Sequence, residues 1–209
     1  MDRLASGEPA PGGGSASAVA ASLGAGLVAM VAALSEGRPR YAEHAQLHAW
    51  GREQGHRLAG TLLALAEADA AAYGVLAAAM KLPRDSEAQV ATRKEAMRAA
   101  ARTAADVPLH CVVACREVVQ AAEALAGRSN VNASSDLNVA ALLGEAGARG
   151  AAANVMINLP MVADEAYATE AREKVARLLA EIERLAQETH RVVESGEVRL
   201  PHVPGTARA

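Results

Sequence analysis

The sequence predicts an all-α fold, a bundle of five to six antiparallel helices. Alanine supplies 53 of the 209 residues, phenylalanine is absent, and aromatic residues make up 2% of the chain. Alanine is the strongest helix former, whereas sandwiches and barrels need many β-branched and aromatic side chains. A hydrophobic fraction of 51% also excludes a disordered chain. We expect one helical domain over residues 1–200 and a flexible tail over residues 201–209.

The first predicted helix runs from Ser15 to about Ser35. Ser15 follows three glycines and is a favoured N-cap residue, while Gly37 and Pro39 end the helical pattern. Small residues recur at every fourth position, which lets a crossing helix approach closely. The stretch carries no charge and reaches the length of a membrane span, but its small side chains transfer weakly into lipid. We therefore expect a helix buried in protein, without membrane contact.

Three further helices are predicted in the middle of the chain. The first covers residues 41–80, where several glycines offer places for a bend. Ser86 and Gln89 have the spacing of a capping box and open the next helix. Pro108 is expected to kink or split that helix, because proline lacks the backbone N–H and crowds the preceding turn. The part after the proline counts as a fourth helix and ends at Leu125.

Two more helices follow a loop over residues 128–133. The fifth is capped by one of residues 134–136 and ends before Pro160, and Asp164 caps the last. Apolar positions of the last helix step three and four residues apart, so they form one buried seam. These positions are Val175, Leu178, Ile182, Leu185, Thr189 and Val192.

Charge and cysteine content exclude several partners. The net charge of −3 leaves no basic surface of the size that nucleic acids require. Cys111 and Cys115 are too few for a disulfide framework, and we interpret them as small core residues of a reduced protein. The sequence therefore predicts a cytoplasmic protein without a nucleic-acid or membrane partner.

The glycine run before the first helix is a candidate anion site. The backbone N–H groups of Gly12, Gly13, Gly14 and Ser15 are uncluttered, and a helix N-terminus favours a carboxylate or a phosphate. The run is not a P-loop, because no Lys-Ser or Lys-Thr pair follows it. The alternative is a tight entry turn at which another part of the chain crosses.

Three polar side chains interrupt otherwise apolar helices. Asp69 lies in an alanine-rich stretch, where burial would favour a protonated carboxyl group and hence a general acid. The alternative for Asp69 is a solvated helix position. Asn154 and Asn158 lie four residues apart on one helix face, and their amides suit the edge of a heterocycle or an interhelical hydrogen bond.

Asp136 and Asn154 face the same way but lie far apart. They are separated by 18 residues, which corresponds to about 27 Å along an unbroken helix. One small ligand therefore does not reach both within a single chain. Either they serve different ends of the helix, or a second subunit brings copies of them together.

One pair of histidines has a spacing that permits metal binding. His44 and His48 lie four residues apart, but no HExxH motif or third ligand accompanies them. We expect no metal site and interpret both histidines as solvated positions on a long helix.

Four segments, taken in order, resemble the formiminotetrahydrofolate cyclodeaminase and methenyltetrahydrofolate cyclohydrolase family. They are Pro9 through Ser15, Asp69 through Tyr73, Asn130 through Asp136, and Asn154 through Leu159. The similarity extends from Leu4 to about Gly196, and the order of the segments is more specific than any one motif. The chain departs from the pattern at Ser129, where a glycine is usual, and its 209 residues include no formiminotransferase domain.

The resemblance implies an all-helical homodimer with a folate-binding groove and no tightly bound cofactor. Its substrate would be a tetrahydrofolate derivative. In the deaminase reaction, N10 of the folate attacks the formimino carbon on N5, and ammonia leaves to give the 5,10-methenyl bridge. Asp69 would then supply the proton for ammonia, and Asp69 or Asp136 would stabilise the cationic product.

Binding roles follow from the same resemblance. Asn154 and Asn158 would contact the pterin or the benzamide, and Gly12 through Gly14 would hold the glutamate carboxylates. Asn130 and Asn132 would be further binding positions in their loop.

Two other functions stay open. Methenyltetrahydrofolate cyclohydrolase shares the fold and much of the site, with water delivered to the methenyl carbon. A non-catalytic folate-binding protein or helical scaffold would fit the alanine-rich core and the lack of a recognisable catalytic triad.

Overall fold

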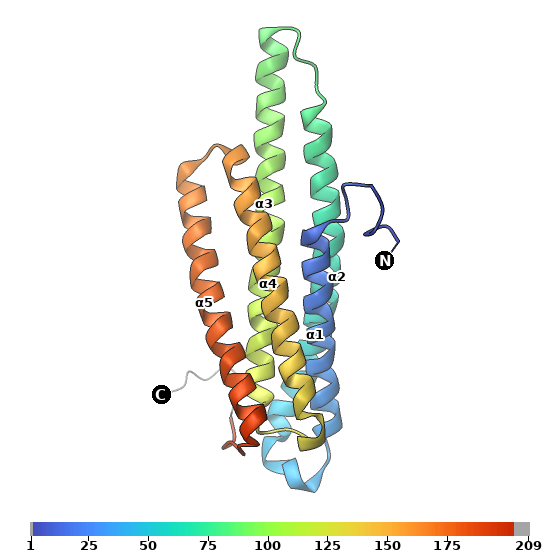
Figure 1. The fold of residues 1–209 in the computed structure, drawn as a ribbon, viewed down its shortest axis with the longest axis vertical. Helices are drawn as coiled ribbons and strands as arrows, with labels where there is room; N and C mark the ends of the chain where they lie inside the picture. Colours follow the sequence, from blue (N-terminus) through green and yellow to red (C-terminus); the bar gives the residue numbers. More distant parts are fainter. Residues whose placement is uncertain (1, 203–209) are drawn as a thin grey trace.

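The computed structural model describes residues 2–202, and over that range it is all-helical, as predicted. Figure 1 shows an elongated bundle in which successive helices run in alternating directions along a common axis. The five α-helices are α1 (Gly13–Ser35), α2 (Ala45–Met80), α3 (Glu87–Leu125), α4 (Ser134–Val162) and α5 (Glu165–Ser195). Two short 3-10 helices, η1 (Pro39–His44) and η2 (Val131–Ala133), join them at the lower end in Figure 1. Residues 203–209 of the expected tail lie outside the described residues.

α1 is the central element of one half of the bundle. It packs against α2 on one side and α4 on the other, while α3 contacts both of these helices and α5 covers α3 and α4. α2 and α3 extend together beyond the start of α1, as the upper part of Figure 1 shows. The polar side chains at the start of α1 therefore face α2 and α4.

Small residues allow the backbones of these helices to touch. A Cβ atom on Gly55 of α2 would lie 2.6 Å from the backbone nitrogen of Ala29 in α1. A Cβ on Gly147 of α4 would lie 2.7 Å from the carbonyl oxygen of Ser17. Gly51 and Gly55 thus serve close packing, and α2 runs from Ala45 to Met80 as one helix.

Pro108 was expected to kink or split its helix, and the split into two helices was wrong. α3 continues through Pro108. Proline leaves the carbonyl oxygen four residues earlier, that of Ala104, without its helical donor. The side-chain amide of Asn158 in α4 donates to this oxygen at 2.8 Å, so the free carbonyl is satisfied within the bundle.

Other predicted helix ends have mixed outcomes. Ser86 caps α3 by accepting from the backbone N–H of Gln89, and Asp164 caps α5 by accepting from that of Tyr167. The predicted end before Pro160 was wrong, because α4 continues to Val162. Its turn into α5 uses a left-handed residue, Ala163, with φ of 55°.

Two predicted N-caps were also wrong. α1 begins at Gly13 with Gly12 in the cap position, so Ser15 lies inside the first turn. α4 begins at Ser134 after Ala133, which places Asp136 in the first helical turn rather than at the cap. Ser15 and Asp136 therefore do not cap their helices, and their side chains can make other contacts.

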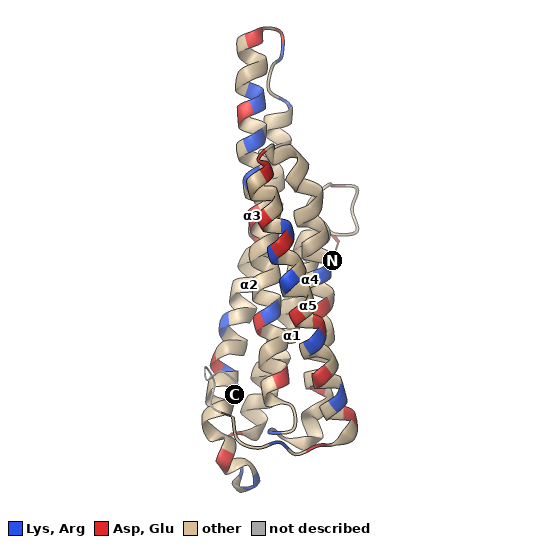
Figure 2. Ribbon diagram, turned by 90° about the vertical axis from the view of Figure 1, so that its left-hand side faces the viewer, with Lys and Arg blue, Asp and Glu red and all other residues tan. Residues whose placement is uncertain are grey.

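The distribution of charge separates the helices. α5 carries a buried apolar seam and many charged side chains, as predicted. α1 carries no charged side chain (Figure 2). By length and composition, the helical segments Gly13–Ser35 and Pro39–Met80 could each cross a membrane. A helix in the core of a protein outside a membrane passes the same test, and 56% of the most apolar window of α1 is buried in the bundle.

Candidate active site

Three helices bring predicted site residues together at the start of α1. The Ser15 hydroxyl oxygen lies 2.8 Å from Oδ2 of Asp69 in α2. On the other side, a Cβ on Gly13 would lie 3.8 Å from the amide nitrogen of Asn154 in α4. Asp69 and Asn154 are half-buried, and Gly14 and Ser15 are buried. The glycine run, Asp69 and Asn154 therefore form one cluster, which we call the upper cluster.

Glycine at position 14 makes room for the carboxyl group. A Cβ at Gly14 would lie 2.7 Å from Cγ of Asp69, far inside van der Waals contact. The carboxyl group thus lies against the side of the first turn of α1, near the positive end of the helix dipole. The helix N-terminus that we expected to hold a ligand anion therefore already has a carboxyl group of the protein beside it.

The Ser15 hydroxyl has two oxygen neighbours that compete for its single proton. Besides Asp69, the carbonyl oxygen of Ala66 lies 3.0 Å away. When Asp69 is ionised, the hydroxyl can donate to the carboxylate. When Asp69 is protonated, its O–H can donate to Ser15, which then donates to Ala66. Both protonation states of Asp69 are therefore satisfied by one small rotation of a hydroxyl group.

The two asparagines of α4 have different amounts of free hydrogen-bonding capacity. The amide of Asn154 donates to the carbonyl of Gly150 at 3.0 Å, which leaves a second N–H. The amide of Asn158 donates to the carbonyls of Ala104 and Asn154 at 2.8 and 2.9 Å. Asn158 thus has a structural task beside any contact with a ligand, for which its oxygen remains.

The remaining predicted site residues lie at the other end of α1. The backbone N–H of Asn130 donates to the Ser35 hydroxyl at 2.8 Å, and its amide donates to the carbonyl of Leu34 at 3.4 Å. Asn132 is exposed and Asp136 is half-buried in the first turn of α4. Since α1 has 23 residues and spans about 33 Å, these residues do not meet the upper cluster within one chain.

Two histidines at this lower end were misjudged from the sequence. His44 and His48 are buried, not solvated, at 4% and 1% exposure. Nε2 of His48 lies 2.9 Å from the carbonyl oxygen of Arg128, and Nε2 of His44 lies 3.4 Å from Oε1 of Glu43. Burial lowers the pKa of His44; the charge of Glu43 opposes this to a smaller extent, and His48 and Arg128 act with the burial. His44 is therefore neutral at pH 7.

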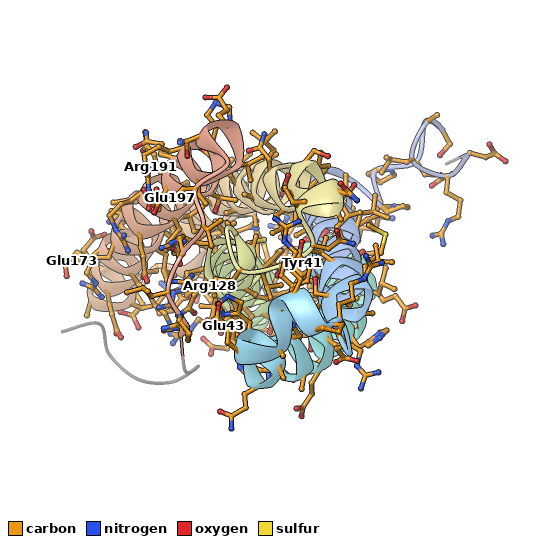
Figure 3. All side chains as sticks on the ribbon, turned by 90° about the horizontal axis from the view of Figure 1, so that it is seen from below. Tyr41, Glu43, Arg128, Glu173, Arg191 and Glu197 are labelled. Atoms are coloured by element: carbon orange, nitrogen blue, oxygen red, sulfur yellow. The ribbon has the colours of Figure 1, made fainter. Side chains whose placement is uncertain are left out.

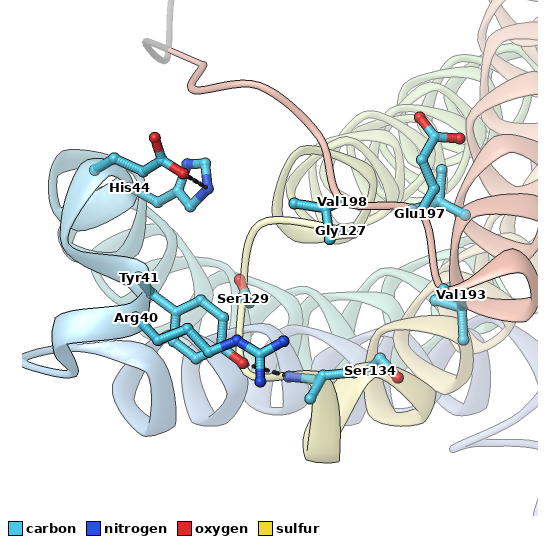
Figure 4. Close-up of a pocket in the computed structure, with 13 residues that line it drawn as sticks. Arg40, Tyr41, His44, Gly127, Ser129, Ser134, Val193, Glu197 and Val198 are labelled. Carbon is cyan, nitrogen blue, oxygen red and sulfur yellow. Dashed lines mark hydrogen bonds and ion pairs between the residues drawn. The ribbon is translucent and has the colours of Figure 1, made fainter.

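A cavity of about 170 Å³ opens beside His44. η1, the loop before α4 and the end of α5 line it, as Figure 4 shows with Tyr41, Ser129 and Val198. Seen from below, η1 with Tyr41 and Glu43 lies beside the loop that carries Arg128 (Figure 3). Nδ1 of His44, Nδ1 of His48 and Oγ of Ser129 are buried without a hydrogen-bond partner among the described residues. We call these three side chains the lower cluster.

The sequence did not predict the lower cluster, because Ser129 lies far along the chain from the two histidines. Only the i, i+4 spacing of the histidines pointed to it, and that spacing does not report burial. Among residues 2–202, no group of three or more His, Cys, Asp or Glu side chains is placed to hold a metal ion. Cys111 and Cys115 are buried, with sulfurs 3.9 Å apart, and their hydrogen bond and burial raise the pKa of Cys115. Their interpretation as core thiols is confirmed.

Comparison with known proteins identifies the family. The family model described as formiminotransferase-cyclodeaminase matches residues 1–177. The chain belongs to this family. It is 37% identical over 195 residues to a methenyltetrahydrofolate cyclohydrolase of Methylorubrum extorquens, covering 93% of this chain and 94% of that protein. It is also 37% identical over 172 residues to the formimidoyltransferase-cyclodeaminase of Gallus gallus, where it spans 32% of the longer protein.

A solved relative agrees with the fold. The crystal structure of a formiminotetrahydrofolate cyclodeaminase from Thermotoga maritima superposes with a TM-score of 0.83. It is 27% identical and covers 93% of both chains. The family therefore includes chains of this extent named for either of the two reactions that the sequence motifs suggested.

Proposed function

We propose that the chain is a folate one-carbon enzyme whose upper cluster converts 5-formiminotetrahydrofolate to 5,10-methenyltetrahydrofolate and ammonia. Membership of the family supports a folate enzyme of the cyclodeaminase and cyclohydrolase class. The observation that carries the assignment to this site is the contact of Ser15 with both Asp69 and Ala66, because it equips one carboxyl group to give and take a proton.

The proposed reaction needs a proton at one step. N10 attacks the formimino carbon and passes its own proton to the formimino nitrogen. The C–N bond to the resulting amino group then breaks as that nitrogen takes up a second proton and leaves as ammonia. Protonated Asp69 supplies this second proton, and the Ser15 hydroxyl turns from Ala66 toward the carboxylate that forms. The new carboxylate then lies beside the cationic methenyl product and stabilises its charge. The spare N–H of Asn154 orients the substrate across the cluster.

Methenyltetrahydrofolate cyclohydrolase is the second candidate. It is favoured by the relative from Methylorubrum extorquens, which matches over nearly its whole length. In this reaction Asp69 would begin ionised and take a proton from the water that attacks the methenyl carbon. The same Ser15 switch would operate in the opposite order.

One assay separates the candidates. Purified protein is given 5-formiminotetrahydrofolate or 5,10-methenyltetrahydrofolate, while methenyl absorbance and ammonia are followed. Methenyl formation with equimolar ammonia supports the deaminase, and methenyl decay faster than in buffer supports the cyclohydrolase. Absence of both reactions, with or without folate binding, contradicts the proposed activity and leaves a binding or scaffold role.

We further propose that the active unit is a homodimer in the cytoplasm. The exposed apolar residues of α1 and α4 suggest a surface that a second copy covers. They are Val19, Leu23, Met30 and Leu34 on α1, and Val139, Leu142, Met156 and Ile157 on α4. The absence of charge on α1 supports this, because an outward helix face without Lys, Arg, Asp or Glu is unusual for a surface exposed to water.

A two-fold arrangement would solve the separation of the predicted residues. If two copies of α1 pack in opposite directions, the start of one lies near the end of the other. Asp136 and the Asn130 loop of one chain would then approach Asp69 of its partner. Each dimer would contain two such composite sites.

A further inference from the structure

The cationic side chains of the α2–α3 hairpin differ from those elsewhere in the protein. Most arginines in the rest of the bundle are paired with a carboxylate, for example Arg57 with Glu117 and Arg116 with Glu181. The five cations between residues 81 and 98 have no ion pair within the described range: Lys81, Arg84, Arg93, Lys94 and Arg98. Only three acidic residues occur in that segment, so it is locally basic in a chain with net charge −3.

Three of these cations line one groove. The groove is lined by Arg93, Lys94, Met97 and Arg98 of α3, and by Met161 and Ala163 at the end of α4. Its volume is about 340 Å³. Nε of Arg98 is buried without a hydrogen-bond partner among residues 2–202. Cations beside apolar side chains suit a ligand that combines a hydrophobic body with carboxylates.

The groove lies on α3 and α4, farther toward the α2–α3 turn than Asn154 and Asn158. On α4, Asn154, Asn158 and Met161 lie four and three residues apart and so occupy one stripe. On α3, Ala104 receives the amide of Asn158, and Arg98 and Lys94 lie about 9 and 15 Å farther along the helix. A ligand that starts at Asp69 and follows the α4 stripe therefore arrives at the cations.

The upper cluster itself is a poor place for ligand carboxylates. The Asp69 carboxyl group occupies the side of the first turn of α1, and the carboxylate that the proposed reaction generates there would repel a second carboxylate. The glutamyl group of the proposed substrate needs another site, and it is joined to the reacting end by a flat benzoyl amide. Met97 and Met161 offer an apolar surface for that ring.

We propose that this groove is the subsite for the p-aminobenzoylglutamate portion of the substrate, with Lys94 and Arg98 binding its carboxylates. The inference rests on the proposed function for the identity of the ligand. It replaces the earlier assignment of the carboxylates to Gly12 through Gly14.

Binding of substrate fragments tests the subsite without requiring turnover. The probes are 4-aminobenzamide, p-aminohippurate and p-aminobenzoylglutamate, which share the ring and carry no, one and two carboxylates. Calorimetry should show affinity rising along the series. The Lys94→Gln/Arg98→Gln double variant should lose about tenfold for p-aminobenzoylglutamate, less for p-aminohippurate and nothing for 4-aminobenzamide. Arg184→Gln, which removes an exposed α5 cation without an ion pair, is the matched control and should bind like the native protein.

Kinetics then distinguish failure of the subsite from failure of the proposed function. The KM for 5-formiminotetrahydrofolate should rise about tenfold in the double variant with kcat unchanged, while the KM for the corresponding 5-formiminotetrahydropteroate, which lacks the glutamate, should not move. Equal affinities for the three fragments, or equal losses with both substrates, would overturn the subsite. Inactivity of the native protein on every folate would instead contradict the proposed reaction, and the fragment series would still decide on the groove.

Discussion

The two ends of α1 carry polar clusters that differ in how their hydrogen bonds are satisfied. In the upper cluster, Ser15, Asn154 and Asn158 all have partners from their own or a neighbouring helix. In the lower cluster, Nδ1 of His44 and Oγ of Ser129 are buried with no partner among the described residues. A buried unsatisfied group costs about 1–3 kcal/mol. The hydrogen bonds of the upper end are thus arranged around one carboxyl group, whereas the lower end contains buried polar atoms that could still accept or donate a hydrogen bond.

Removing the carboxylate of the upper cluster should have the largest effect. Asp69→Asn keeps the shape of the side chain but cannot carry the proton, so turnover should fall about 10²-fold or more. Circular dichroism and the thermal midpoint should stay close to native. Glu67→Gln, two residues away and exposed on α2, is the control and should retain full activity. Near-normal turnover of Asp69→Asn would remove Asp69 from the mechanism.

Displacing the same carboxylate by one methyl group should have the next largest effect. In Gly14→Ala, the new Cβ would overlap the Asp69 carboxyl group, and we expect turnover to fall about 10- to 100-fold. Gly60→Ala in α2 is the control, because no atom outside its own helical turn lies within 4 Å of a Cβ there. The control should be fully active and slightly more stable. Equal activity of the two variants would show that Asp69 is not positioned by α1.

The two ends should become one site if the dimer forms as proposed. Leu23→Glu places a charge on the exposed apolar face of α1, so the variant should sediment as a monomer and lose activity. Leu63→Glu, similarly exposed on α2, should stay dimeric. A native protein that sediments as a monomer at micromolar concentration would contradict the dimer.

Mixing two inactive variants tests whether the clusters come from different chains. Asp69→Asn and Asp136→Asn, unfolded and refolded together, should regain about a quarter of native activity, because half of the dimers are mixed and each has one intact composite site. No recovery in verified mixed dimers would mean that the ends act separately.

The contact between Asn158 and the carbonyl freed by Pro108 should contribute a smaller, purely structural energy. Asn158→Leu leaves the Ala104 oxygen without its donor and should cost about 1–3 kcal/mol in urea unfolding. Pro108→Ala restores a helical N–H to that oxygen, so the cost of Asn158→Leu should shrink in its presence. Asn138→Leu, also half-buried on α4, provides the control. Additive effects of the two changes would contradict this role of Asn158.

These cases show which features the sequence could predict. The all-α fold, the caps Ser86 and Asp164 and the α5 seam depend on residues within a few turns, so local patterns identified them. The continuity of α3 depends on Asn158, which lies 54 residues from Ala104, and the burial of His48 depends on a carbonyl 80 residues away. No periodicity in the chain reports such contacts.

The candidate site was predictable in part for the same reason. Asp69, Asn154 and the glycine run were selected as polar or flexible exceptions in an apolar sequence, and the bundle brings them together. Asn130, Asn132 and Asp136 were selected in the same way, but the bundle places them at the far end of α1. Helix length and the choice of neighbouring helix decide which of these polar residues come together. A short sequence motif contains neither piece of information.

The smallest expected effect is that of the lower cluster on the pH dependence of the stability of the fold. Burial lowers the pKa of His44 in the folded protein below its ordinary value of 6.5, so the unfolded chain binds a proton more readily. The contribution of the neutral imidazole is therefore complete above pH 6.5 and declines as the pH falls toward the folded value. Urea midpoints measured from pH 7.5 to 5.5 should drop more for the native protein than for His44→Gln. The control is His190→Gln, which changes an exposed histidine of α5 and should follow the native curve. If the His44→Gln curve runs parallel to the native one, protonation of His44 does not account for the loss of stability at low pH.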